Sequence, residues 1–286
     1  MMIFKKQREE EREPQYYMSM TNIKALNYKV YYMKSLEKVL TFLVIFAMGA
    51  ICGYLFFGGL CKNEFGEPTR MTYILNVVIC SIIGSGAGII FLPIREKQII
   101  AKRQNMIKLQ FLDMLESLST SLNAGKNVTN AFLTVQQDLL TQYDEEAFIN
   151  NEMKIIVAGI RNNQELEVLL NDFGKRTGIK DIMMFASIFR ISYRRGGDIK
   201  NVIKNTNDIM KDKIMIEEEI ITAMTSGKSE LNMMMVMPVV MVALFKSMGD
   251  LGDNLATPSG IVAMLVAIAI FVVAYFVGRK VMEIKI

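Results

Sequence analysis

The sequence contains no histidine and no tryptophan, and only 3 cysteines and 5 prolines among 286 residues. Without histidine the chain cannot form a Ser-His-Asp or Cys-His nucleophile system, a histidine-ligated metal site or a phosphohistidine relay. Cys52, Cys61 and Cys80 lack the C-x-x-C spacing of a thiolate zinc site, and they lie in or beside apolar runs rather than in a disulfide framework. The composition therefore predicts no enzyme activity, no metal and no cofactor.

Charge is also missing from four stretches, at residues 39–60, 71–94, 231–245 and 254–278. A helix rises about 1.5 Å per residue, so about 20 residues cross the ~30 Å hydrocarbon core of a bilayer. The third stretch is short and contains Pro238, and it spans a bilayer only if Lys246 reaches the interface. A buried amphipathic helix is the alternative there. We predict transmembrane helices at 39–60, 71–94, 231–248 and 255–278.

Basic residues are distributed unevenly around these stretches. Residues 1–38 hold eight Lys and Arg, residues 95–230 hold nineteen and the tail 279–286 holds three, whereas loops 61–70 and 246–253 hold two and one. Lys and Arg are retained on the cytoplasmic side of a membrane. The count predicts that both termini and segment 95–230 are cytoplasmic. Tyrosines among lysines at 18–38, including Tyr28, Tyr31 and Tyr32, predict a juxtamembrane amphipathic helix within the N-terminal segment 1–38.

The segment 95–230 carries nineteen basic and nineteen acidic residues, a balance that argues against nucleic-acid binding. Its apolar residues recur at helical spacing, as in Ile107, Phe111, Leu115, Leu118 and Leu122. Turn-forming residues divide it near 125, 143–144, 162–163, 174–178 and 196–197. We therefore predict an all-α membrane protein, with four transmembrane helices, two on each side of a cytoplasmic bundle of about six helices.

Three of the predicted helix starts look alike. They follow Gly125-Lys126-Asn127, Asn162-Asn163-Gln164-Glu165 and Gly196-Gly197-Asp198, each a turn former and a polar cap before an aliphatic residue. Glycine allows the positive φ that ends one helix, and Asn or Asp caps the next. A repeated helical hairpin explains this pattern without a ligand. The predicted structural turn residues are Gly125, Gly178, Gly196, Gly197 and Pro238.

Motifs for other functions are incomplete. Gly227-Lys228-Ser229 ends like a phosphate-binding P-loop, but Thr222 stands in place of the first glycine. The three long apolar stretches contain no ionisable residue, which disfavours an ion-coupled transporter. Pro238 and the run Gly84-x-Gly86-x-Gly88 keep a small four-span transporter or channel as the alternative function, although such glycines also allow close helix packing.

Several stretches of 109–238 occur together in one order. They are Leu122-Asn123-Ala124-Gly125, Leu166-Glu167-Val168-Leu169-Leu170, residues 173–181, Arg194-Arg195-Gly196-Gly197-Asp198-Ile199 and residues 220–238. Together they resemble the cytoplasmic domain of the type II secretion F family, the inner-membrane platform proteins of type II secretion, type IV pilus and tight-adherence (Flp) pilus machines. The single copy of the domain and the two predicted spans on each side are most like the tight-adherence branch.

The resemblance implies a non-catalytic platform in the bacterial inner membrane. It implies that the platform meets a cytoplasmic hexameric secretion ATPase and transmits its motion to pilin or pseudopilin subunits in the lipid bilayer. Classical secretion and pilus platforms carry two copies of the domain, so a single copy implies a homologous partner platform or self-association.

The resemblance also draws attention to a surface that binds a partner, formed by Lys126, Lys175, Arg194, Arg195 and Asp198. Two adjacent arginines beside a double glycine exceed what a helix end requires, since one left-handed glycine suffices. We expect the basic residues to face an acidic patch on the ATPase or on the partner platform. The alternative is that Arg194 and Arg195 merely offset the carbonyl end of a helix, which contributes about 0.3–1 kcal/mol.

Overall fold

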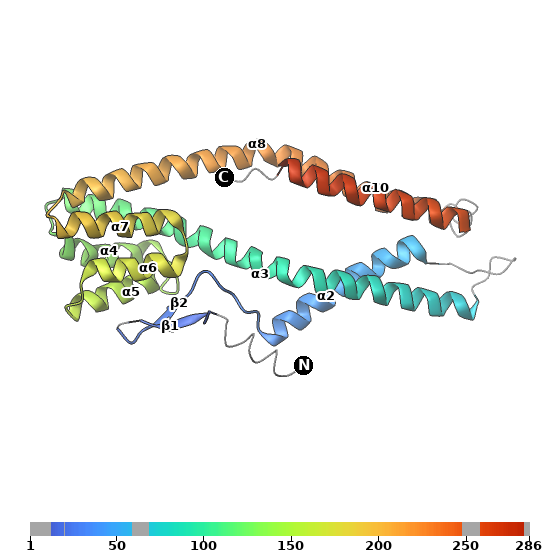
Figure 1. Ribbon diagram of the computed structural model, residues 1–286, viewed down its shortest axis with the longest axis horizontal. Helices are drawn as coiled ribbons and strands as arrows, with labels where there is room; N and C mark the ends of the chain where they lie inside the picture. Colours follow the sequence, from blue (N-terminus) through green and yellow to red (C-terminus); the bar gives the residue numbers. More distant parts are fainter. Residues whose placement is uncertain (1–12, 20, 59–68, 248–257, 283–286) are drawn as a thin grey trace. The chain divides into compact units, whose positions relative to one another are not determined.

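The computed structural model describes residues 13–19, 21–58, 69–247 and 258–282 (Figure 1). The chain divides into two compact units. The bundle unit combines the N-terminal segment up to Tyr32 with Glu96–Met215, and the apolar unit combines Met33–Arg95 with the chain from Ile216 onward. Two helices, α3 and α8, each contribute to both units.

Helices account for nearly all of the secondary structure in the described residues, which confirms the predicted all-α class. The elements are β1 (Tyr16–Met18), β2 (Lys24–Leu26), α2 (Ser35–Phe57), α3 (Arg70–Asn123), α4 (Val128–Gln142), α5 (Phe148–Arg161), α6 (Leu166–Thr177), α7 (Lys180–Arg194), α8 (Ile199–Ser247) and α10 (Pro258–Met282). The two short strands pair antiparallel.

The core of the bundle unit forms where the apolar stripes of its helices meet. Ile107, Phe111, Leu115 and Leu118 of α3 are fully buried, as their spacing predicted, and Leu122 packs against the same core. The ring of Phe111 lies 5.9 Å from that of Phe173 in α6 and 5.4 Å from that of Phe185 in α7. Such offset and edge-on ring pairs add stabilisation beyond the area that they bury.

Three turns of the bundle have one backbone design. Gly125, Asn163 and Gly196 have φ of 84°, 57° and 67°. In each turn the next residue donates a backbone hydrogen bond five residues back: Lys126 to Ser121, Gln164 to Gly159 and Gly197 to Ser192. This is the Schellman arrangement, in which a left-handed residue ends the helix. The three turns join α3 to α4, α5 to α6 and α7 to α8, and Figure 1 shows them together at one end of the bundle, called here the turn end.

Two of the predicted turn residues behave differently. Gly197 has no positive φ, and it lies close to Ser192, whose carbonyl oxygen would be 3.3 Å from an added Cβ. Pro238 lies inside α8 rather than at a turn, which corrects the prediction. Proline removes one backbone hydrogen bond, and packing among apolar helices tolerates that loss. The predicted break near 174–178 falls at Gly178, which caps α6 with φ of 68°. Gly174 instead lies inside α6, where an added Cβ would be 3.2 Å from Met183 Cα.

Among the described residues, three helices are long and apolar enough to cross a membrane, namely α2, α3 and α8. Within α10 the apolar stretch Val262–Gly278 is shorter. The predicted spans 71–94 and 231–248 are not separate helices. They belong to α3 and α8, which continue into the bundle unit without interruption at the predicted boundaries, 95 and 230. Residues 59–60, 248 and 255–257 of the predicted spans lie outside the described residues. The four-span count therefore stays a prediction.

Glycines set the packing of α2 against α3. A Cβ on Gly49 would lie 3.0 Å from Gly84 Cα, and one on Gly88 would lie 2.5 Å from the ring of Phe42. A Cβ on Gly86 would have no atom within 4 Å. Two of the three glycines in the run thus allow close helix packing, as small residues do between membrane helices.

The predicted amphipathic helix within residues 18–38 is wrong for most of its length. The chain forms the β1–β2 hairpin and an extended segment, and helical structure begins only at Ser35. Tyr28 is 1% exposed and lies in the bundle core, with its ring 5.5 Å from that of Phe148. The tyrosine and lysine pattern suggested a lipid interface, but the buried side chains of α5 and α6 provide a protein environment instead.

Candidate functional site: a buried ion pair and an exposed basic end

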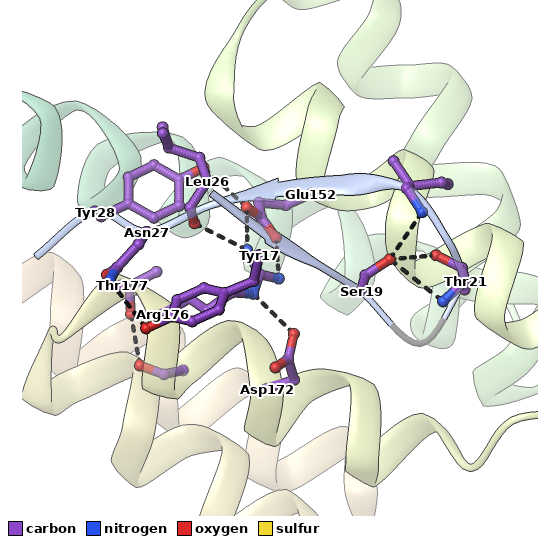
Figure 2. Close-up of polar contacts among 12 residues, drawn as sticks. Tyr17, Ser19, Thr21, Leu26, Asn27, Tyr28, Glu152, Asp172, Arg176 and Thr177 are labelled. Atoms are coloured by element: carbon purple, nitrogen blue, oxygen red, sulfur yellow. Dashed lines mark hydrogen bonds and ion pairs between the residues drawn. The ribbon is translucent and has the colours of Figure 1, made fainter. Parts of the chain in front are cut away.

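A buried ion pair joins α5 to α6 beneath the hairpin. Arg176 donates from Nη1 and Nη2 to the two carboxylate oxygens of Glu152, at 2.7 and 2.6 Å. Arg176 is 5% exposed and Glu152 is 1% exposed. The two parallel bonds form a planar fork, the geometry in which an arginine–carboxylate pair is strongest. Figure 2 shows the fork between the hairpin and α6.

The N-terminal segment completes this cluster. The hydroxyl of Tyr28 donates to Glu152 Oε1 at 3.0 Å, and the backbone N–H of Tyr28 donates to the carbonyl of Arg176 at 3.0 Å. Arg176 Nη1 also donates to the carbonyl of Leu26 at 3.2 Å, and its Nε donates to Asp172 at 2.8 Å. The cluster therefore ties the N-terminal segment to α5 and α6 (Figure 2), although Tyr28 and Glu152 are 124 residues apart in the sequence.

Burial and charge act in opposite directions on Arg176. Burial alone lowers its pKa, but the hydrogen bonds and negative charge of Glu152, followed by those of Asp172, raise the pKa above its usual range. Burial, and next the charge and hydrogen bond of Glu152, raise the pKa of Tyr28 well above 10.0. The arginine stays charged and the tyrosine neutral, so each group makes bonds that suit its protonation state. Three donors occupy the two carboxylate oxygens of Glu152, and this cluster fits a structural role.

The turn end of the bundle carries the two arginines that were predicted to bind a partner. Arg194, at the end of α7, donates to Glu167 and Glu165 at the start of α6, each at 3.0 Å. The hydrogen bond to Glu167, followed by the charge of Glu165, raises the pKa of Arg194. Arg194 therefore holds two helix ends together, a role that the sequence did not predict. Arg195 is exposed and makes no ion pair with any described residue.

The other predicted site residues are not all near these arginines. Asp198 caps α8, with its Oδ1 accepting from the backbone N–H of Asn201 at 3.1 Å. Lys126 lies on another turn of the turn end, where its Nζ donates to Thr134 at 2.8 Å. Lys175 lies in the last turn of α6, eight residues after Glu167, which places it about 12 Å away along the helix. The structure thus separates Lys175 from the other four.

The turn end carries more basic residues than the sequence analysis selected. Arg161 ends α5 and Lys200 lies in the first turn of α8, and both are exposed. The turn end thus presents Lys126, Arg161, Arg195 and Lys200 from all three Schellman turns, whereas its exposed acids are Glu165, which pairs with Arg194, and Asp198, which caps α8. Such clustering of one sign of charge favours an acidic partner.

Residues 114–245 match the family model described as Type II secretion system (T2SS), protein F. This F match supports the resemblance to the F family over residues 114–245. Together with the apolar helices, it supports a membrane protein associated with secretion machinery. The tight-adherence branch stays a prediction. Comparisons with curated proteins and with solved structures find no match.

The F match covers the end of α3, helices α4 to α7 and nearly all of α8. Glu152 and Arg176 lie inside it, whereas Tyr28 lies outside. The sequence analysis did not select Glu152 or Arg176, because charged residues of an amphipathic helix ordinarily lie on its solvent-facing side. One feature of the sequence could have indicated a paired arginine in α6. Asp172 and Arg176 are spaced i, i+4 on this helix, and the nearby Leu169 and Phe173 are apolar.

No group of three or more metal-type side chains occurs among the described residues. The apolar unit contains a cavity of about 360 Å³ between α2, α3, α8 and α10, and Pro238, Cys52 and Phe271 are among the residues that line it. The residues that line this cavity are all apolar. Its lining has no charged side chain, and the thiol of Cys52 is its one titratable group.

Proposed function

We propose that this protein is a non-catalytic inner-membrane platform of a type II secretion or type IV-like pilus machine, specifically of the tight-adherence (Flp) kind. In this role it couples a cytoplasmic secretion ATPase to the assembly of pilin subunits. The observation that carries the proposal is the F match across 114–245, in a chain whose α3 and α8 continue from the bundle unit into apolar segments.

Continuous helices are suited to mechanical coupling. Helix α3 has 54 residues and α8 has 49, and neither is broken between the bundle unit and the apolar unit. A displacement of the bundle is therefore passed along the hydrogen-bonded backbone of both helices, without a flexible linker to absorb it. Both termini are cytoplasmic in this proposal, and four spans cross the membrane.

The turn end is the proposed contact with the ATPase. Lys126, Arg161, Arg195 and Lys200 are exposed there, and Arg194 is already engaged with α6. Reversing Arg194 would place a carboxylate against Glu165 and Glu167 and weaken the fold itself. Arg195 and Lys126 are therefore the residues to reverse in a test of docking.

The test uses the full chain in membranes that also contain the secretion ATPase. Replacement by Lys126→Glu with Arg195→Glu should abolish co-purification of the ATPase and filament assembly, with little change in thermal unfolding followed by circular dichroism. Lys175→Glu is the matched control, because it reverses one exposed lysine at the other end of α6. Filament assembly by the doubly reversed variant at the wild-type level would contradict the proposal.

The purified protein should hydrolyse no nucleotide. Gly227, Lys228 and Ser229 lie within α8, whereas a P-loop needs a strand, a glycine-rich turn and a helix N-terminus. An ATP turnover that follows the protein through purification and is lost in Lys228→Ala would contradict the non-catalytic role. The alternative, a small transporter or channel, gains no support from the cavity in the apolar unit, because its walls offer no polar path.

A further inference from the structure

The cavity of the apolar unit is closed in part and open in part. Gly53 of α2 and Met264 of α10 are buried where they line it, whereas Phe271 and Val272 of α10 line it and are 41% and 45% exposed. Helices α2, α3 and α8, which also contribute to its walls, are apolar and long enough to cross a membrane. The open part therefore meets the hydrocarbon of a bilayer.

The lining of the cavity determines the chemistry of its occupant. Atoms that border an empty space lose their dispersion contacts, so a cavity open to a fluid is favourably filled by it. Water is a poor occupant, because a buried water molecule needs about two to four polar partners. The lining offers only the thiol of Cys52 as a polar side-chain group. Hydrocarbon is the occupant that these walls suit.

The volume of the cavity distinguishes between a lipid chain and a protein helix. An apolar cavity of about 150 Å³ holds one benzene molecule, so by proportion a larger cavity of about 360 Å³ has room for roughly fourteen carbon atoms. A helix about 10 Å wide fills roughly 120 Å³ per residue, so less than one helical turn would fit in the same space. An acyl chain can therefore enter the cavity, whereas a helix of another protein could only cover its opening.

A positive charge lies beside one end of this cavity. Val242 of α8 and Phe57 of α2 both line it. Lys246 follows Val242 by one helical turn, about 6 Å, and its Nζ donates to the carbonyl of Gly58, the residue after Phe57, at 2.7 Å. Both helices thus place the ammonium group beside the same end of the cavity. A lysine with an apolar stem and a charged head suits the boundary between hydrocarbon and phosphate.

We propose that this cavity binds an acyl chain of a membrane phospholipid, with the phosphate of the lipid held by Lys246. The volume and the apolar lining select the acyl chain, and the ammonium group at the end of the cavity selects the phosphate. The bound chain fills space between α2, which precedes the bundle in the sequence, and α8 and α10, which follow it. The proposal goes beyond the platform role, because it needs a bilayer but neither an ATPase nor a pilin.

Tryptophan fluorescence tests this site, because the chain has no tryptophan of its own. Phe271→Trp places an emitter in the wall of the cavity, and Phe276→Trp places one on the same helix, at a 64% exposed position outside the lining. Each full-length variant is purified in detergent and titrated with a phospholipid whose acyl chains carry bromine, which quenches the fluorescence on contact. Quenching of Phe271→Trp should saturate once each chain has bound a lipid, whereas quenching of Phe276→Trp should follow the bulk lipid content without saturating.

Further substitutions in the Phe271→Trp chain locate the two ends of the lipid. Ala267→Phe fills the cavity and should abolish the saturable quenching, whereas Ala269→Phe, at an exposed position outside the lining, should leave it unchanged. Lys246→Gln should raise the half-saturating lipid concentration about tenfold, because it removes a charge-assisted bond to the phosphate. Lys280→Gln, which neutralises an exposed lysine near the end of α10, is the matched control.

Three results would overturn the proposal. Equal quenching of Phe271→Trp and Phe276→Trp without saturation would show that the cavity binds no lipid. An unchanged half-saturating concentration in Lys246→Gln would show that the phosphate does not lie at this lysine. Quenching of Phe271→Trp that appears only when the protein is diluted would show that a second copy covers the cavity instead. None of these results depends on Ala267→Phe, the variant most at risk of misfolding.

Discussion

Arg176 bonds to three parts of the bundle unit through one side chain. It is buried, charged and bonded to α5, to α6 and to the N-terminal segment. A buried ion pair does not necessarily stabilise a fold relative to apolar residues of the same size, but loss of one partner leaves the other charge buried and unpaired. The cluster therefore determines where the N-terminal segment lies, whatever its net contribution to stability.

Arg176→Met should lower the free energy of unfolding by about 3–5 kcal/mol, because Glu152 then remains buried without its partner. The measurement is thermal unfolding of the full chain in detergent, followed by circular dichroism. The triple variant Tyr28→Phe, Glu152→Met and Arg176→Met should recover most of this loss, since it leaves neither a buried charge nor a buried hydroxyl without its partner. A triple variant less stable than Arg176→Met would contradict this account.

Stability should fall at high pH. Burial and Glu152 raise the pKa of Tyr28, and burial and the hydrogen bond to Asp113 raise the pKa of Tyr143 to about 12. In both cases the folded state favours the neutral phenol. The contribution of these two tyrosines to the free energy of unfolding is complete below 10.0, the pKa of tyrosine in the unfolded chain. It is lost as the pH rises above that value. Midpoints of thermal unfolding between pH 8 and 11.5 measure the effect, and the variant with Tyr28→Phe and Tyr143→Phe should show a shallower decline than the wild type.

The sequence predicted the residues that cap helices better than the residues that bond across the fold. Gly125, Gly196 and Asp198 form their turn and cap interactions with residues a few positions away, so the sequence alone predicts these interactions. Tyr28 and Glu152 are 124 residues apart, and nothing local to either indicates the other. The same distinction applies to Arg194, which looked like a helix-end charge and in fact bonds to α6.

At the scale of elements, the helices followed the apolar periodicity and the breaks followed the turn residues. The wrong predictions concern segments in which the local preference of the residues differs from the structure that their surroundings impose. Pro238 suggested a turn, yet α8 continues through it, and the tyrosines of the N-terminal segment suggested a helix where a hairpin forms. The predicted borders at 95 and 230 fall inside α3 and α8, because charge marks where the apolar surface ends and not where a helix ends. The first of them agrees with the border between the two units, which lies between Arg95 and Glu96.

Packing of α2 on α3 should depend on individual glycines. A side chain at Gly84 would lie 2.8 Å from the ring of Phe46 and 2.9 Å from its carbonyl oxygen, whereas one at Gly86 meets nothing within 4 Å. Gly84→Ala should therefore lower stability in detergent by about 1–3 kcal/mol, the usual effect of overpacking. Gly86→Ala is the matched control on the same helix and should leave the unfolding midpoint unchanged. Equal effects of the two substitutions would contradict this packing.

For the whole molecule, the distribution of Lys and Arg predicts orientation. Single cysteines placed at exposed positions of segment 95–230 should resist a membrane-impermeant thiol reagent in intact cells. Cys61, which lies outside the described residues, should be labelled, because the topology places it beside an outer loop. Labelling of segment 95–230 from outside would contradict the cytoplasmic position of the bundle. Permeabilised cells provide the control, since every exposed cysteine should then react.

The attachment of the N-terminal segment also sets an order of events during synthesis. Leu26 leaves the ribosome 150 residues before Arg176, the side chain that binds its carbonyl. At about 5–20 residues per second, that interval lasts roughly 8–30 s. Helices α2 and α3 are both complete before Arg176 is made, so the first apolar hairpin can enter the bilayer while Tyr28 still has no binding site. The N-terminal segment is thus translated well before the helices that bind it.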